Sequence, residues 1–262
     1  MRRGQQLMNN DIGPILEDWP HDEGQITVRK IRGADGQIRI QLRVDLGLLQ
    51  MATEGRPDGQ KPHGFESLLA YVEDLLQRHQ RTHGTDEGFS IDAEQCERLR
   101  AEAVQYYYRY LSEFVLDDYD AVVRDTDRNL RVLDVCAKYA DDESDRFVME
   151  QYRPYILMMN TRARTNLALK RRRPKAAQRI VNDALGRLRQ FYSRFGQDDL
   201  YKHSTEVAAL EELAQEIEEK ISPDPVDKLK RLLAKAVEDE RYEDAARLRD
   251  AVARAARQET QR

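Results

Sequence analysis

The feature that most constrains this chain of 262 residues is a helical periodicity that runs almost without a break from Ser90 to the end. Apolar residues recur there every three or four positions, which places them on one face of an α-helix. Because 35% of all residues are charged, each helix is expected to bury one face and expose the other. We predict helices over 92–115, 118–139, 145–170, 174–195, 205–221, 225–239 and 243–257.

The alternation typical of β-strands is confined to the N-terminal part of the chain. Strands are predicted over 25–31, 37–45 and 48–53, with a turn at Gly33–Gly36, where glycine permits a positive φ. The second strand is expected to turn its polar residues toward solvent: Arg39, Gln41, Arg43 and Asp45. Residues 1–24 read as a loop or short turn anchored by Trp19. A helix over 64–81 would cover the sheet.

Composition and patterning exclude several classes of protein. The chain has no apolar run long enough to cross a membrane and no apolar segment typical of a secretory signal. Cys96 and Cys136 are its only cysteines and do not form a CxxC pair, so a reducing cytoplasm is the expected location.

The middle of the chain has the pattern of paired helices. Ala177, Val181, Ala184 and Leu185 resemble the second half of a tetratricopeptide repeat, and the segment 118–130 resembles the same half-repeat. The resemblance implies a tetratricopeptide-like helical array over 90–221. An ordinary helical bundle remains the alternative, since both predict the same helical hairpins.

Positive charge is concentrated in residues 162–194, where eleven Lys and Arg residues face one acid, Asp183. Such a patch can bind phosphate backbones, can pair with an acidic protein surface, or can be a solvated helix face. One acidic candidate within the chain is 113–127, with six acids against one Arg. The candidate nucleic-acid-binding residues are Lys170, Arg171, Arg172, Arg173, Lys175 and Arg179.

Residues 226–257 predict two short helices around a tight acidic turn, with leucines lining the first and alanines the second. So small a hairpin buries little area alone, which favours association with a partner. The segment Ala236–Asp250 resembles the UVR motif of the bacterial excision-repair subunits UvrB and UvrC, although a generic alanine-rich hairpin is the alternative. The resemblance implies docking onto another such hairpin, a second copy included. It also implies a repair subunit, or an ATPase or arginine kinase of protein quality control, as partner. The candidate partner-binding residues are Leu229, Leu232, Leu233, Ala236, Tyr242, Ala245, Ala246, Leu248, Arg249 and Val252.

No catalytic constellation or cofactor motif stands out. His79 and His83 have the i, i+4 spacing of a metal pair but are more simply explained as cations at a helix end. The many carboxylates are expected on exposed helix faces, where pKa shifts are small. An enzyme built on Arg39, Arg43 and His63 of the N-terminal unit is the third alternative.

Four tyrosines cluster in one predicted helix: Tyr106, Tyr107, Tyr108 and Tyr110. Packing in a core is the simpler interpretation, and anchoring a peptide is the alternative.

The sequence therefore predicts a mainly α protein in four parts. These are a small α+β unit (1–88), a tetratricopeptide-like array (90–221), a linker (222–225) and a UVR-type hairpin (226–262). The expected function is that of a non-enzymatic adaptor that needs no cofactor or metal and docks to another protein through its C-terminal hairpin. A nucleic-acid-binding accessory factor that uses 162–194 is the alternative.

Overall fold

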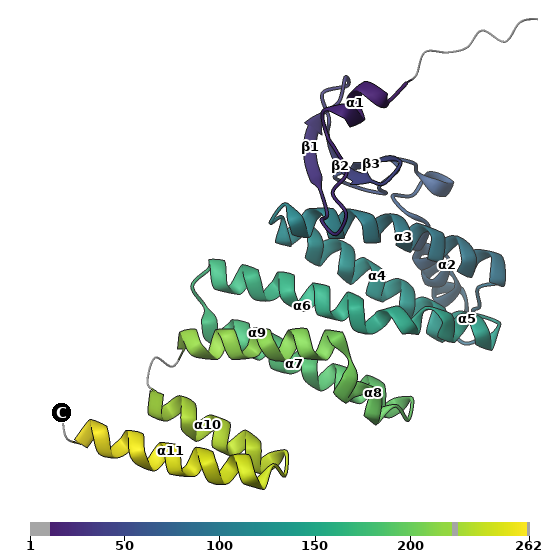
Figure 1. Cartoon of the computed structure of the whole chain (residues 1–262). Coiled ribbons are helices and arrows are strands. Elements are labelled where there is room, and N and C mark those ends of the chain that lie inside the picture. Colours follow the sequence, from purple (N-terminus) through teal and green to yellow (C-terminus); the bar gives the residue numbers. More distant parts are fainter. Residues whose placement is uncertain (1–10, 222–224, 261–262) are drawn as a thin grey trace, which may run out of the picture. The chain divides into compact units, whose positions relative to one another are not determined.

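The computed structural model describes residues 11–221 and 225–260, with side chains except at 220, 225–228 and 255–260. Residues 1–10, 261–262 and most of the predicted linker, 222–224, lie outside the described residues. The chain forms two compact units, 1–163 and 164–262, and the boundary falls inside helix α6 (Arg153–Lys170). The predicted boundaries near 89 and 222 do not coincide with this division. The mainly α fold with a small N-terminal sheet is confirmed (Figure 1).

The sheet is an antiparallel meander of three strands, β1 (Val28–Arg32), β2 (Ile38–Val44) and β3 (Gly47–Ala52). Ile40 of β2 pairs with Lys30 on one side and Met51 on the other. The predicted glycine turn closes β1 onto β2, because Gly36 has a φ of 78° and the Gly33 amide donates to Gln37 at 2.8 Å. The three strands thus agree with the sequence pattern to within three residues at each end.

The prediction that Gln41 and Arg43 face solvent is wrong, since both are buried. Arg43 donates from Nε to the Trp19 carbonyl and from Nη1 to the Gly47 carbonyl, both at 2.8 Å. Trp19 follows the short helix α1 (Gly13–Glu17), and the Arg29 guanidinium lies 4.1 Å above its ring. The N-terminal segment thus supplies a partner for Arg43, which alternation alone does not reveal.

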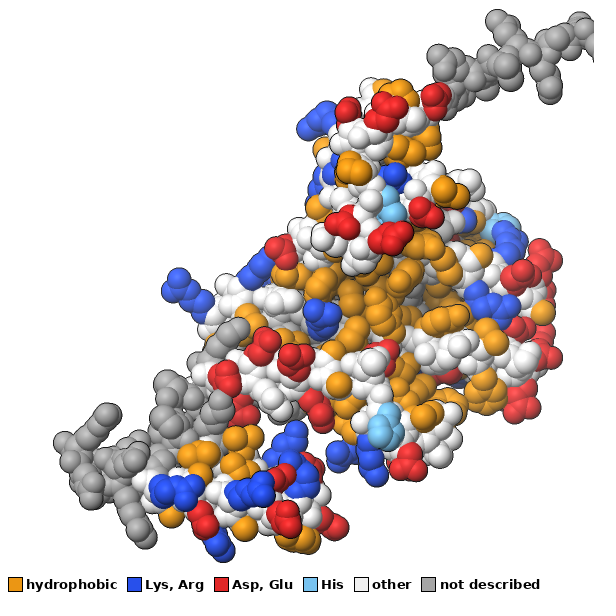
Figure 2. Space-filling model, in the orientation of Figure 1, with side chains coloured by type: hydrophobic (Ala, Val, Ile, Leu, Met, Phe, Trp, Pro, Cys, Tyr) orange, Lys and Arg blue, Asp and Glu red, His pale blue; other side chains and the backbone are white. Residues whose placement is uncertain are grey.

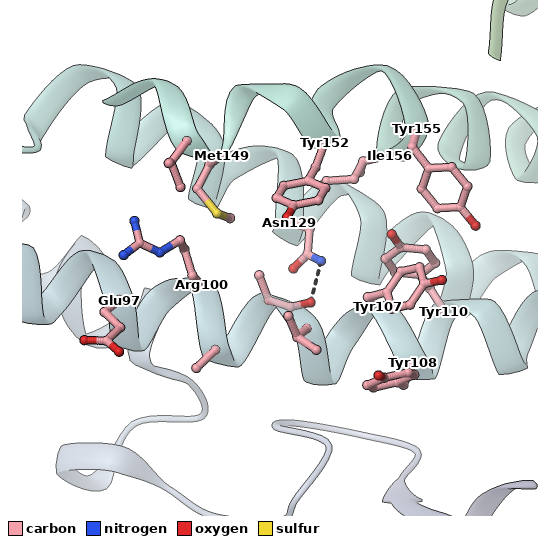
Figure 3. Close-up of a pocket in the computed structure, with 14 residues that line it drawn as sticks. Glu97, Arg100, Tyr107, Tyr108, Tyr110, Asn129, Met149, Tyr152, Tyr155 and Ile156 are labelled. Carbon is pink, nitrogen blue, oxygen red and sulfur yellow. Dashed lines mark hydrogen bonds between the residues drawn. The ribbon is translucent and has the colours of Figure 1, made fainter. Parts of the chain in front are cut away.

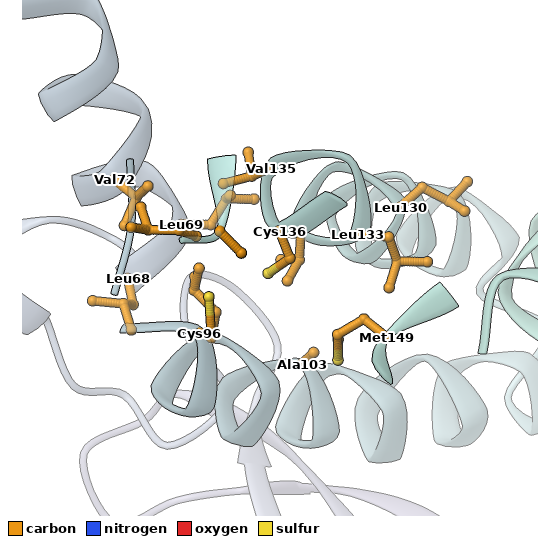
Figure 4. Close-up of a cluster of buried hydrophobic side chains, with 14 of the residues drawn as sticks. Leu68, Leu69, Val72, Cys96, Ala103, Leu130, Leu133, Val135, Cys136 and Met149 are labelled. Carbon is orange, nitrogen blue, oxygen red and sulfur yellow. The ribbon is translucent and has the colours of Figure 1, made fainter. Parts of the chain in front are cut away.

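Three helices build the largest core of the first unit: α2 (Leu68–His83), α3 (Ala93–Val115) and α4 (Tyr119–Tyr139). Ser67 caps α2, and Asp92 with Gln95 forms a capping box on α3. Figure 4 shows Leu69 and Val72 of α2 in this core with Cys96 of α3 and Leu133 and Cys136 of α4. Burial of these side chains fixes the three helices against one another.

The expectation that carboxylates lie on exposed helix faces is wrong for three acids of α3 and α4. Arg109 of α3 and Asp125 of α4 are fully buried and form two hydrogen bonds, at 2.6 and 2.8 Å. Arg109 also donates to the carbonyl of Ala52, the last residue of β3, and to that of Gly55 just beyond it. This one guanidinium therefore joins the two helices to the sheet.

Two further glutamates of α3 are buried beside this contact. Glu102 accepts hydrogen bonds from the Leu68 and Leu69 amides at the start of α2, and it pairs with Arg128. Burial, with Asp125 nearby, raises the pKa of Glu113 to about 8, although Arg124 donates to this carboxyl at 3.0 Å. The acids of this region therefore have partners within the first unit.

The helix predicted over 145–170 is interrupted. The structure has α5 (Glu143–Val148), a 3-10 turn at Glu150–Tyr152, and then α6. Pro154 has no amide hydrogen, so it cannot donate to the carbonyl four residues earlier, and a continuous helix is broken there. Arg153 bonds Glu150 at 2.7 Å across the break.

The second unit contains α7 (Pro174–Arg194), α8 (Asp198–His203), α9 (Thr205–Ile221), α10 (Pro225–Glu238) and α11 (Tyr242–Thr260). Helix α7 packs against α9 and buries Val181, Ala184 and Leu188, while α9 buries Leu210 and Ile217. The pattern did not predict α8, a helix of six residues that is too short to show periodicity. The tetratricopeptide-like array stays a prediction.

Removing one partner of the Arg109–Asp125 pair should unfold much of the first unit. Arg109→Met leaves Asp125 buried without its main partner, at an expected cost of about 3–5 kcal/mol in urea denaturation. The double variant Arg109→Met/Asp125→Leu should recover a large part of that loss. The matched control, Arg98→Met on the exposed face of α3, should cost less than about 0.5 kcal/mol. A loss below about 1 kcal/mol for Arg109→Met would contradict the assigned role.

Candidate functional site

Helices α10 and α11 pack along each other as a hairpin closed by a three-residue turn, Asp239–Arg241. Glu240 adopts a left-handed conformation with a φ of 57°, and the Arg241 amide returns to the Ala236 carbonyl at 2.8 Å. The Arg241 guanidinium bonds Asp239 at 3.2 Å and Asp244 at 3.0 Å. The acidic residues that mark the turn in the sequence thus stabilise it by bonding Arg241.

Small residues form the contact between the two helices. Ala236 of α10 and Ala245 of α11 are buried, which allows the helix axes to approach closely. Four other predicted residues are half-buried: Leu229, Leu233, Leu248 and Val252. These six candidate residues therefore lie in or near the internal packing of the hairpin.

The larger apolar residues at the turn end of the hairpin are exposed. Tyr242 is 68% exposed, Val237 is 52% exposed and Leu232 is 36% exposed. Ala246 is exposed as well. Leu232 lines a cavity of about 670 Å³ together with Leu185 of α7 and Ile221 of α9, whereas Val237 and Tyr242 do not line it. Tyr242 and Val237 are thus the apolar side chains most open to a partner.

Arg249 and Asp250, predicted as rim residues, are exposed and form an ion pair with each other at 2.9 Å. An exposed pair of neighbouring side chains stabilises a hairpin little. The predicted contact of both residues with a partner stays untested. On the other side of α10, Arg231 pairs with Glu218 of α9 at 3.2 Å.

The basic residues form a second candidate surface, which we call the basic turn: Arg171, Arg172, Arg173, Lys175 and Arg179. The three arginines fill the connection between α6 and α7, and all five side chains are exposed. Within the described part of the chain, none of the five has a carboxylate within 4 Å. Lys170, the last residue of α6, is also exposed. The first turn of α7 contains no acid that could neutralise them.

Some carboxylates of the acidic segment 113–127 already pair with an arginine of the first unit. Glu113 and Asp125 are buried there, and both bond Arg124. Two of the six acids counted in the sequence therefore already have arginine partners.

The residues of the metal and enzyme alternatives have other neighbours in the described part of the chain. The His79 and His83 rings lie 4.4 Å apart, but the His79 Nε2 is 2.9 Å from the Glu87 carbonyl. No group of three or more metal-ligating side chains occurs within 11–221 and 225–260. Arg39 bonds Asp35, and His63 stacks on Tyr71. No described helix is long and apolar enough to span a bilayer.

Comparison with known proteins identifies one segment. The family model described as the UvrB/uvrC motif matches residues 224–258, which include α10 and most of α11. The chain therefore contains a UvrB/UvrC motif, as its sequence pattern indicated. No curated protein and no solved structure matches the chain.

The close approach at Ala236 provides a test of the hairpin. Ala236→Leu inserts three carbons where no space exists and should cost about 1–3 kcal/mol. Backbone amides of α10 and α11 should then exchange with solvent faster, as measured by hydrogen–deuterium exchange. Ala234→Leu, at an exposed position of the same helix, is the matched control and should leave exchange unchanged. Equal exchange in both variants would show that Ala236 is not a packing contact.

Proposed function

We propose that this protein is a non-enzymatic adaptor that binds another protein through the exposed apolar end of its C-terminal hairpin. The observation that carries the proposal is the exposure of Val237 and Tyr242 on a hairpin whose internal contact uses small residues. Large exposed apolar side chains beside polar ones are typical of interaction sites. The UvrB/UvrC motif is an interaction motif, so its presence is compatible with this role.

The proposed partner carries a complementary apolar helix face, as a second hairpin of the same kind would. A repair subunit, a protein-quality-control ATPase or kinase, and a second copy of this chain are the partners that the motif suggests. The protein is proposed to act in the cytoplasm, which agrees with two buried free thiols, Cys96 and Cys136.

A pull-down from nuclease-treated extract tests the proposal. The full-length protein used as bait should enrich a partner that the double variant Val237→Asp/Tyr242→Asp does not recover. A carboxylate at each of these positions would have to lose its bound water when the partner docks, which is unfavourable. In titration calorimetry with that purified partner, the double variant should bind at least tenfold more weakly, a change of about 1.4 kcal/mol.

Arg247→Asp, at an exposed position of α11, is the control and should bind like the native chain. Sedimentation equilibrium of the same three proteins detects self-association through the hairpin. Equal recovery of every partner with native protein and double variant, with no change in mass, would refute the proposal.

A second function, binding of nucleic acid through the basic turn, is favoured by the five cations without described acidic partners. Each cation that neutralises a phosphate releases condensed counterions, so the affinity falls as salt rises.

Replacing the three turn arginines should weaken binding to a labelled DNA duplex regardless of sequence. Arg171→Ser/Arg172→Ser/Arg173→Ser should reduce the slope of log affinity against log salt by about 2–3. The matched control is Arg78→Ser/Arg98→Ser/Arg231→Ser, which removes arginines paired with Asp74, Glu94 and Glu218. Absent binding, or equal slopes for the two triple variants, would exclude this function.

A further inference from the structure

A groove of about 610 Å³ runs along the face of α3 opposite to the buried ion pairs. We call it the tyrosine groove. Figure 3 shows Tyr107 of α3 on one side and Met149, Tyr152 and Ile156 on the other. Val104 of α3 also lines the groove. Of the clustered tyrosines, Tyr106 is buried away from the groove, whereas the buried Tyr110 and the half-buried Tyr107 and Tyr108 line it. Core packing therefore holds for Tyr106, and anchoring of a peptide stays a prediction for the others.

Large apolar side chains at the rim of the groove are open to solvent. Tyr152 is 53% exposed, Val104 is 50% exposed and Val148 is 41% exposed. Figure 2 shows hydrophobic side chains gathered into a patch over the region where Figure 1 places α3. Contiguous exposed apolar surface on a folded unit marks a place where another molecule binds.

The tyrosines at one end give the groove polar contacts. The Tyr107 ring lies 5.6 Å from Tyr110 and 6.1 Å from Tyr155. Burial, with Tyr155 and Tyr107 nearby, raises the pKa of Tyr110, so this hydroxyl keeps its proton. A tyrosine offers an apolar ring face and a hydroxyl that bonds peptide groups, and it loses little conformational entropy on binding.

The other end of the groove is acidic. Glu97 lines it, and the Asp141 amide bonds the Ile91 carbonyl at 3.0 Å, which brings the start of α5 beside the start of α3. Segments 92–100 and 141–146 contain seven carboxylates against three arginines, a net charge of −4. Arg100 is already paired with Asp145 at 2.6 Å. The exposed acids are Asp92, Glu94, Glu97, Asp141, Asp142 and Glu143.

The length of the groove suits a peptide. From Glu97 to Tyr110, α3 advances thirteen residues, or about 20 Å at 1.5 Å per residue. An extended chain covers that distance with about six residues. A small-molecule site would instead gather a few polar groups around one point, whereas here the tyrosines and the acids lie at opposite ends.

We propose that the tyrosine groove binds a short segment of a partner protein that carries bulky apolar side chains and has Lys or Arg at one end. The apolar side chains lie between Val104 and Tyr152, and the cations lie beside Glu97 and the start of α5. The charges at the acidic end select the direction of the segment. This surface belongs to the first unit, and the hairpin proposed above belongs to the second.

Selection from a displayed library of random twelve-residue peptides on the full-length protein tests the proposal. Enriched peptides should share at least two large apolar residues and a Lys or Arg cluster on one side. One such peptide, labelled with fluorescein, is then titrated by anisotropy. Val104→Glu should weaken binding of this peptide at least about tenfold, because the bound peptide would bury the new carboxylate without a partner.

Val115→Glu is the matched control, since Val115 is 46% exposed at the end of the same helix and lies outside the groove. It should bind the peptide like the native chain. Glu97→Lys/Glu143→Lys should weaken binding about threefold or more at low salt and by less at high salt. Circular dichroism melting of each variant verifies that it is folded.

The hairpin variant Val237→Asp/Tyr242→Asp should retain the peptide, which separates this proposal from the adaptor function. Any of three results would overturn the proposal. The first is that the selected peptides share no common pattern, and the second is that Val104→Glu and Val115→Glu bind the labelled peptide equally well. The third is that the selected peptides lack basic residues and that Glu97→Lys/Glu143→Lys leaves their binding unchanged.

Discussion

The buried contact between Arg109 and Asp125 is the interaction on which the rest of the first unit depends. Removing both charges from water is expensive, and the cost is offset only because Arg109 also satisfies the carbonyls of Ala52 and Gly55. The pair therefore ties the end of β3 to α3 and α4. With one face of α3 committed to these contacts, the opposite face, with Val104 and Tyr107, remains available for the groove.

Two groups of arginines in this chain differ sharply in their surroundings. Arg109 and Arg128 are buried and hold buried carboxylates, so they serve the fold. Arg171, Arg172 and Arg173 lie exposed in a turn, with no described carboxylate nearby. A solvated cation without a partner contributes little to stability, and its field reaches about a Debye length into solvent. The side chains of the basic turn are therefore better suited to binding another molecule than to stabilising the fold.

The two proposed interaction surfaces differ in kind, and each belongs to one unit. The hairpin uses Ala236 and Ala245 to bring its helices together and leaves Val237 and Tyr242 outside. The tyrosine groove instead lies beside the 3-10 turn at Glu150–Tyr152 that separates α5 from α6, and Tyr152 of this turn lines it. A protein with both surfaces can hold two partners at once, which is what an adaptor requires.

The sequence by itself determined the local elements and the motif. Among the described residues, apolar periodicity located every helix of more than six residues and alternation located the three strands, while Ala236–Asp250 identified the C-terminal motif. Each of these features is set by residues that lie close to one another in the sequence. Tertiary structure alone decided that Gln41, Arg43 and Asp125 are buried and that Tyr107 lines a groove while Tyr106 is in the core. The physical reason is that a polar side chain can be buried only where a distant segment supplies its hydrogen-bond partners, as Trp19 does for Arg43 and Arg109 for Asp125.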